Sequence, residues 1–210
     1  MPDAHYCEAA QGWTGLRFAK EAYAEVEKIR PELQEHPFVR AAWLDAWLLD
    51  DEWTKAREIA TCLTNEFPDE PVFWLHLAYA TRRAEGGGVE QALEVLDGVL
   101  NEFPSEWMIP YNMACYLCQL ERLEEAKSLL RKTIPVAQRV VGNSTSMTLT
   151  MRKTYARALY QDANATLDDL REAVNTLEET ERTARRVLGG AHPLTVNIER
   201  NLQKARAALA

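Results

Sequence analysis

Apolar and polar residues follow a helical period along most of this chain. Apolar positions recur three and four residues apart, which places them on one face of an α-helix. No stretch shows the sustained alternation of β-branched and polar residues that indicates a strand. Proline and glycine cluster between the periodic stretches, where they end helices. The pattern therefore predicts an all-α protein.

The helical pattern itself repeats around five alanines. Ala22, Ala56, Ala92 and Ala126 lie at intervals of 34, 36 and 34 residues, and Ala173 follows after 47 more. Each has an apolar residue three positions before it and another four positions after it. A period of this size indicates stacked helix pairs. In a chain of 210 residues it favours a solenoid over one or two globular domains.

Local signals mark where the helices begin and end. The sequence Asn-Glu-Phe-Pro occurs at 65–68 and again at 101–104, and each proline ends one helix and starts the next unit. Thr166 followed by Asp169 predicts a capping box that opens the second helix of the fifth unit.

The third unit follows a known signature most fully, with two extra residues in its turn, and the fourth unit is nearly as good. The positions of the third unit that match the signature are Trp74, Leu77, Ala78, Ala92, Leu96 and Pro104. In this respect the chain resembles the tetratricopeptide repeat family.

The last part of the chain has a longer period. The segment 139–142 recurs in similar form at 186–189, which is 47 residues later. The stretch 185–195 includes Leu-Gly-Gly-Ala-His-Pro, which resembles the joint of kinesin-light-chain-type tetratricopeptide repeats.

The resemblance implies a right-handed α-solenoid of about five helix-turn-helix repeats plus a C-terminal capping helix. We expect one solenoid over 1–210, with repeats at 1–36, 37–70, 71–106, 107–145 and 146–190 and the capping helix at 191–210.

The charge balance limits the classes of partner. The chain has 24 Lys and Arg against 32 Asp and Glu, a net charge of −8, so its field repels phosphate backbones and argues against nucleic acid. No window approaches the roughly 18 apolar residues of a membrane span, and the first residues do not resemble a signal peptide. We therefore expect no membrane partner and a cytoplasmic location. Four free thiols are expected, at Cys7, Cys62, Cys115 and Cys118.

Several residues invite a catalytic or metal-binding interpretation. Cys115 and Cys118 form a single CxxC on a helix, but no second pair completes a zinc site, and packing or groove-lining thiols are favoured. His192 precedes a proline in a joint between helices and has no nucleophile nearby in sequence. The glycines at 86–88 lack the strand and the Gly-Lys of a phosphate loop. We therefore expect no catalytic residue, metal or cofactor, and a protein that is not an enzyme.

Six tryptophans are more consistent with interior packing than with an aromatic binding platform. Trp13 lies at an interface spacing, whereas Trp107 is expected to be only partly buried.

In tetratricopeptide repeats, the first helix of each pair lines a concave groove that binds a peptide. By this resemblance Asn112 corresponds to an asparagine that binds the peptide backbone, while Arg83, Lys153 and Arg157 attract acidic groups. The candidate groove residues are Asp45, His76, Tyr79, Arg82, Arg83, Tyr111, Asn112, Cys115, Gln119, Lys153, Thr154 and Arg157.

The leading hypothesis is a non-catalytic adaptor that binds a peptide or helix of another protein in this groove. A structural spacer or self-associating module is the main alternative. We expect the protein to be a monomer or to self-associate weakly. RNA binding by helical repeats is disfavoured by the acidic charge balance.

Overall fold

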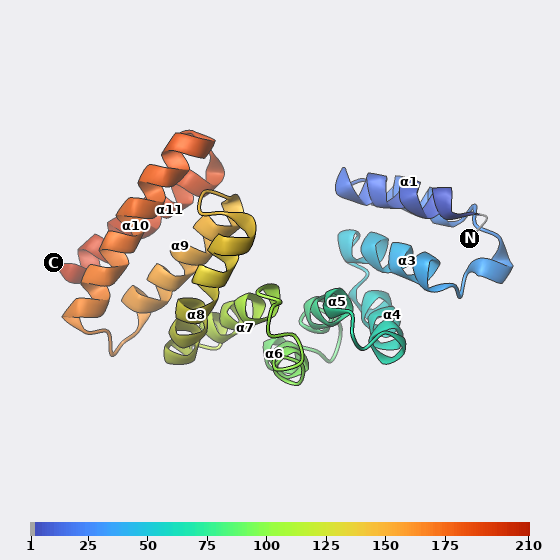
Figure 1. Ribbon diagram of the computed structural model, residues 1–210, viewed down its shortest axis with the longest axis horizontal. Coiled ribbons are helices and arrows are strands. Elements are labelled where there is room, and N and C mark those ends of the chain that lie inside the picture. Colours follow the sequence, from blue (N-terminus) through green and yellow to red (C-terminus); the bar gives the residue numbers. More distant parts are fainter. Residues whose placement is uncertain (1–2) are drawn as a thin grey trace. The chain divides into compact units, whose positions relative to one another are not determined.

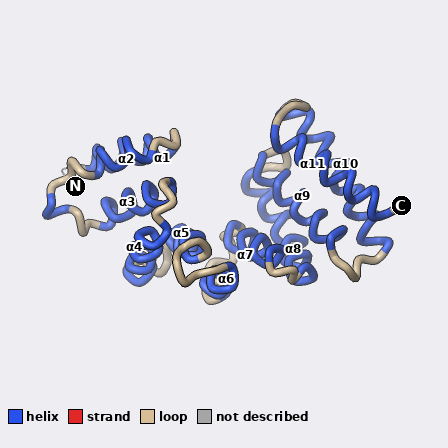
Figure 2. Tube along the Cα trace, turned by 180° about the vertical axis from the view of Figure 1, so that it is seen from behind, coloured by secondary structure: helices blue, strands red, loops and turns tan. Residues whose placement is uncertain are grey.

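The computed structural model describes residues 3–210 (Figure 1). That part of the chain contains eleven α-helices and one 3-10 helix, and it contains no strand (Figure 2). The prediction of an all-α protein is confirmed. The chain divides into two compact units, Met1–Phe103 and Pro104–Ala210.

The N-terminal unit is built from helices that each pack against the next one in sequence. Helix α1 also packs directly against α3, and the short 3-10 helix η1 (Pro31–Leu33) lies in the connection between α2 and α3. The helices are α1 (Ala4–Gly15), α2 (Ala19–Val26), α3 (Pro37–Leu49), α4 (Trp53–Glu66), α5 (Pro71–Thr81) and α6 (Val89–Asp97).

The C-terminal unit has longer helices with the same neighbour-to-neighbour packing. Helix α9 contacts α7, α8, α10 and α11, and α11 packs on α9 and α10. The helices are α7 (Met108–Gln119), α8 (Leu123–Val141), α9 (Ser146–Gln161), α10 (Leu167–Leu188) and α11 (Pro193–Leu209).

The five repeat alanines have no exposed surface. Ala22, Ala56, Ala92, Ala126 and Ala173 are each 0% exposed. A methyl side chain lets two helices approach closely, and a larger side chain would overpack the contact. The spacing seen in the sequence is therefore the spacing of close helix contacts.

Three turns between paired helices place a residue other than glycine in the left-handed region. Arg17, Asp51 and Glu121 have φ angles of 65°, 62° and 58°. In each turn the amide of the next residue donates to the carbonyl five residues before it, at 2.9 to 3.0 Å. This bond is typical of the Schellman motif, which satisfies carbonyls at a helix end.

Two helices begin with the same His-Pro cap. Nδ1 of His36 accepts from the Phe38 amide at 3.3 Å, and Nδ1 of His192 accepts from the Leu194 amide at 3.1 Å. The following proline needs no partner for its nitrogen at the first helical position. His192 thus has a structural role at the start of α11.

The predicted capping box at the start of α10 is confirmed. The Asp169 amide donates to Thr166 Oγ1 at 3.1 Å, and the Thr166 amide donates to Asp169 Oδ2 at 2.9 Å. Two amide donors at the helix start are thereby satisfied.

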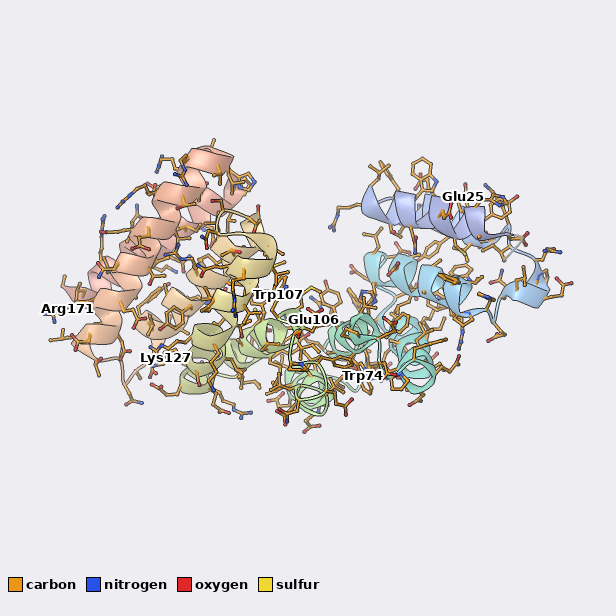
Figure 3. All side chains as sticks on the ribbon, viewed as in Figure 1. Glu25, Trp74, Glu106, Trp107, Lys127 and Arg171 are labelled. Carbon is orange, nitrogen blue, oxygen red and sulfur yellow. The ribbon has the colours of Figure 1, made fainter. Side chains whose placement is uncertain are left out.

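The tryptophans correct two expectations. Trp107 is only 9% exposed, so the prediction of partial burial is wrong, and Trp13 is 36% exposed rather than fully packed. Trp74 is half-buried, and its indole N–H donates to the Pro68 carbonyl at 2.9 Å. Trp74 and Trp107 are both labelled in Figure 3.

Candidate functional site

The predicted groove residues fall into two groups, one in each compact unit. The N-terminal group lies on α3, on α5 and just after α5, and comprises Asp45, His76, Tyr79, Arg82 and Arg83. The C-terminal group lies on α7 and α9, and comprises Tyr111, Asn112, Cys115, Gln119, Lys153, Thr154 and Arg157.

A pocket of about 520 Å³ opens in the N-terminal unit. Its lining brings together residues of α1, α3 and α5, the first residue of α4, and residues of two turns between paired helices. Three predicted groove residues, Asp45, His76 and Tyr79, are part of this lining. The others are Gln11, Thr14, Gly15, Arg17, Leu48, Leu49, Asp51 and Trp53.

Asp45 and His76 lie next to each other in the lining of this pocket without a hydrogen bond between them. His76 Nδ1 is 4.0 Å from Asp45 Oδ1, and the two side chains are 30% and 32% exposed. Burial raises the pKa of Asp45 to about 6 and lowers the pKa of His76 to about 4. At neutral pH the pair is therefore a carboxylate beside a neutral imidazole. Nδ1 of His76 is buried and has no partner in the described chain.

The aromatic wall of the pocket is already associated with a guanidinium group. The rings of Trp53 and Tyr79 meet edge to face, with centroids 5.7 Å apart. The guanidinium carbon of Arg83 lies 3.7 Å from the Tyr79 centroid and 5.0 Å from that of Trp53. Arg83 also donates to the Tyr79 carbonyl at 3.1 Å, so this predicted ligand-binding residue is held by its own segment.

A second cluster lies on α7 and α9 of the C-terminal unit. Burial raises the pKa of the Tyr111 hydroxyl, which interacts with the side chains of Cys115, Thr154 and Arg157. Burial also raises the pKa of both Cys115 and Cys118, although the nearby Arg157 opposes the shift. These thiols are therefore protonated at neutral pH and are not activated nucleophiles.

Lys153 and Arg157 are the positive charges of this cluster. Both are half-buried, and neither forms an ion pair with a carboxylate within residues 3–210. Burial lowers the pKa of Lys153, and the charge of Arg157 lowers it further. By contrast, Lys127, Arg131 and Arg152 of the same unit all have acidic partners. The cluster therefore has uncompensated positive charge.

Two of the predicted groove residues, Asn112 and Gln119, each use one N–H of the side-chain amide in a hydrogen bond within α7. Nδ2 of Asn112 donates to the Met108 carbonyl at 2.8 Å, and Nε2 of Gln119 donates to the Cys115 carbonyl at 2.9 Å. Asn112 keeps its carbonyl oxygen and one N–H for a ligand. Thr154 is buried and donates to the Thr150 carbonyl at 2.9 Å, so it contributes to the floor of the cluster.

Sequence reasoning did not select several residues of these sites. Trp53 was assigned to packing and Asp51 to the solvated surface, and Arg17 was not selected, although all three line the N-terminal pocket. Arg17 and Asp51 lie in turns five residues before a repeat alanine, and Trp53 begins α4 three residues before one, so their spacing could have identified them. Cys118 lies one helical turn after Cys115 and shares its contact with the charge of Arg157.

The described residues hold no cluster of three or more side chains suited to a metal ion. Within residues 3–210 the four cysteines are free thiols. No helix of the described chain is long and apolar enough to cross a membrane.

The paired helices and their buried small residues form a helical repeat fold like that of tetratricopeptide repeats. The family model of the tetratricopeptide repeat matches residues 111–145, which hold α8 and most of α7. The match falls on the fourth unit, whereas the sequence signature favoured the third. The third unit has two extra turn residues, and its second helix, α6, has only nine residues.

Solved structures share this fold. The chain is similar to a thermophilic tetratricopeptide repeat protein of Thermus thermophilus, at 18% identity and a TM-score of 0.70, covering 96% of this chain and 99% of that one. It is similar to a putative kinesin light chain of Podosopora anserina with nearly identical repeats, at 19% identity and a TM-score of 0.66, covering 83% and 88%. It is also similar to BtubC (BKLC) of P. vanneervenii, at 14% identity and a TM-score of 0.61, covering 100% and 89%.

The resemblance to tetratricopeptide repeats, including those of kinesin light chain, is confirmed at the level of fold. No curated protein matches the chain in sequence.

Proposed function

We propose that this chain is a non-catalytic protein-interaction module that binds an acidic peptide segment of a partner on the face formed by α7 and α9. The tetratricopeptide fold supports a role in protein interaction. The acidic character of the guest is inferred from the charges of the C-terminal cluster.

The uncompensated charge of Lys153 and Arg157 is the observation that carries this proposal. The chain has eight more acidic than basic charges, yet these two neighbouring cations have no carboxylate partner in the described chain. Their mutual repulsion and partial burial are unfavourable in the free protein. A carboxylate of a bound peptide would relieve both and form charge-assisted hydrogen bonds.

The neighbouring polar groups would hold the peptide main chain. The free carbonyl oxygen and N–H of Asn112 can pair with a peptide N–H and carbonyl, and the Tyr111 hydroxyl lies in the same cluster. Main-chain bonds add affinity without strong sequence preference, so specificity would come from the charges.

A random peptide library displayed on phage tests this function. The wild-type chain should enrich peptides rich in Asp and Glu, and a selected peptide should bind more weakly as salt is raised. The double variant Lys153→Ala, Arg157→Ala should lose about a hundredfold or more in affinity, because it removes two charged contacts that are each worth roughly 1.5 to 3 kcal/mol.

The matched control is Lys132→Ala, Arg182→Ala, which also removes one Lys and one Arg from the same unit. Both control residues are exposed, on α8 and α10. Affinity should stay within about twofold of wild type in this control. Equal losses in the two double variants would show that only net charge matters, and the proposed face would be wrong.

A further inference from the structure

We infer that the pocket between α1, α3 and α5 binds a basic side chain, with Asp45 as its counter-ion and Trp53 and Tyr79 as its aromatic wall. This rests on the proposed function only in treating the basic side chain as part of a partner polypeptide.

The first argument is the missing counter-ion of Asp45. Asp45 lines the pocket, and within the described residues its carboxylate has a single ion-pair contact, with His76 at 4.0 Å. The pKa of His76 is lowered to about 4 by burial, so the imidazole remains neutral and supplies no positive charge. The pKa of Asp45 is raised to about 6, so the carboxylate is mostly ionised at neutral pH. A guest cation would stabilise this desolvated charge.

The second argument is the chemistry of the walls. Trp53 and Tyr79 offer π surfaces, and the Arg83 guanidinium already contacts both rings, which shows that they accept a cation at short range and places one positive charge beside the wall. A pocket of about 520 Å³ has room for the end of an arginine or lysine side chain. The hydroxyl of Thr14 and the side chain of Gln11 lie on the same lining and can accept further N–H groups.

The other charges at the pocket oppose each other. Asp51 adds a second carboxylate from the turn between α3 and α4, whereas Arg17 adds a cation from the turn between α1 and α2. Arg17 is exposed and forms no ion pair with either carboxylate within residues 3–210. Arg17 therefore lies at the rim, where its charge opposes binding of a guest cation. Removing this charge should strengthen binding of a basic side chain.

Side-chain analogues test this pocket without any knowledge of the partner. N-acetyl-arginine amide and N-acetyl-lysine amide are titrated into the whole chain, with N-acetyl-norleucine amide as the neutral control. The Trp53 indole N–H signal in an NMR spectrum reports on the pocket. We expect one or both basic analogues to shift this signal and the neutral analogue to leave it unchanged. Whichever basic analogue binds more tightly identifies the side-chain type.

Variants connect the signal to the proposed counter-ion. Asp45→Asn should weaken binding of the basic analogue about five- to tenfold, because one charged partner is lost. Asp69→Asn is the matched control, since Asp69 is an exposed residue of the same unit outside the pocket, and it should bind as wild type does. Arg17→Ala should strengthen binding by about twofold.

The dependence on pH gives a second readout. Binding should weaken as the pH is lowered from about 7.5 to about 5, because Asp45 takes up a proton while His76 does not. Absence of binding by both basic analogues, equal binding by the norleucine analogue, or unchanged binding in Asp45→Asn would overturn the inference. The acidic-peptide experiment concerns α7 and α9, so either result can fail while the other stands.

Discussion

Lys127 of α8 donates a hydrogen bond to Asp162, the residue that follows α9, with 2.9 Å between Nζ and Oδ2. The two side chains are only 6% and 8% exposed, and Lys127 is labelled in Figure 3. Burial by itself would lower the pKa of Lys127, but hydrogen bonds to Glu124 and Asp162 outweigh it and raise the pKa. The ion pair ties α8 to the end of α9.

Removing the acidic partner should destabilise the protein strongly. Asp162→Ala leaves Lys127 buried with only the exposed Glu124 as a partner, so we expect a loss of about 2 to 4 kcal/mol in the free energy of unfolding. Lys127→Met should also be destabilising, because it leaves the buried Asp162 carboxylate without a cation and with only the Asn164 amide as a donor. Urea unfolding followed by circular dichroism measures both.

The control for this prediction is Arg171→Ala. Arg171 pairs with Asp168 on the surface, where the side chains are 63% and 91% exposed, and its loss should change stability by no more than about 0.5 kcal/mol. If Asp162→Ala were as mild as this control, the buried pair would not contribute to stability.

The same Gly→Ala substitution should have opposite effects at two positions. A Cβ on Gly87 would lie 1.8 Å from the Thr81 carbonyl oxygen, whereas a Cβ on Gly12, inside α1, would meet no atom within 4 Å. Gly87→Ala must displace backbone and should lower the melting temperature. Gly12→Ala should stabilise by roughly 0.5 to 1 kcal/mol through helix propensity. Calorimetry of the two variants tests this, and shifts of equal sign would contradict it.

The left-handed turn residues should favour glycine. Glu121 has a φ of 58°, a conformation that costs a residue with a Cβ roughly 1 kcal/mol. Glu121→Gly should therefore stabilise the protein modestly, after allowance for the greater freedom of glycine in the unfolded chain. Glu121→Val should destabilise it, because a β-branched residue is least tolerated there. Thermal unfolding of both variants provides the measurement, and a more stable valine variant would contradict the assignment.

Asp45 and His76 should make opposite contributions to the pH dependence of stability. The pKa of Asp45 is raised from 3.8 to about 6, so the folded state takes up its proton more readily, and this contribution falls as pH rises through that range. The pKa of His76 is lowered from 6.5 to about 4, so its contribution rises with pH over nearly the same range. In the wild-type protein the two trends largely cancel.

Single variants should separate these trends. Relative to wild type, His76→Gln should lose stability as the pH rises from about 4 to about 6, because only the Asp45 trend remains. Asp45→Asn should gain stability over the same interval. Denaturant unfolding at several pH values measures both slopes, and parallel profiles for the two variants would show that neither group is perturbed.

The features that sequence predicted well are local or periodic. The repeat alanines could be identified because a close helix contact needs a small residue at a fixed spacing, and all five are fully buried. The capping box of Thr166 and Asp169 could be identified because both partners lie within one helical turn. Such signals depend on neighbours in the chain, which the sequence itself displays.

The features that sequence did not reveal depend on side chains from different helices. The approach of His76 to Asp45 and the burial of Lys127 against Asp162 join residues that are 31 and 35 positions apart in the chain. The lack of an acidic partner for Lys153 and Arg157 likewise depends on which side chains of other helices lie next to α9. Trp107 was misjudged because its position just after a proline does not determine how deeply the ring is covered.

The His-Pro cap has a consequence for how such a protein can grow. The start of α3 and the start of α11 each have a His-Pro dipeptide whose imidazole accepts from the amide that follows the proline, so this cap is made entirely within three consecutive residues. A duplicated segment that begins with this dipeptide brings its own initiation signal to its new location. Gene duplication within the chain could therefore add helices without first evolving a new junction.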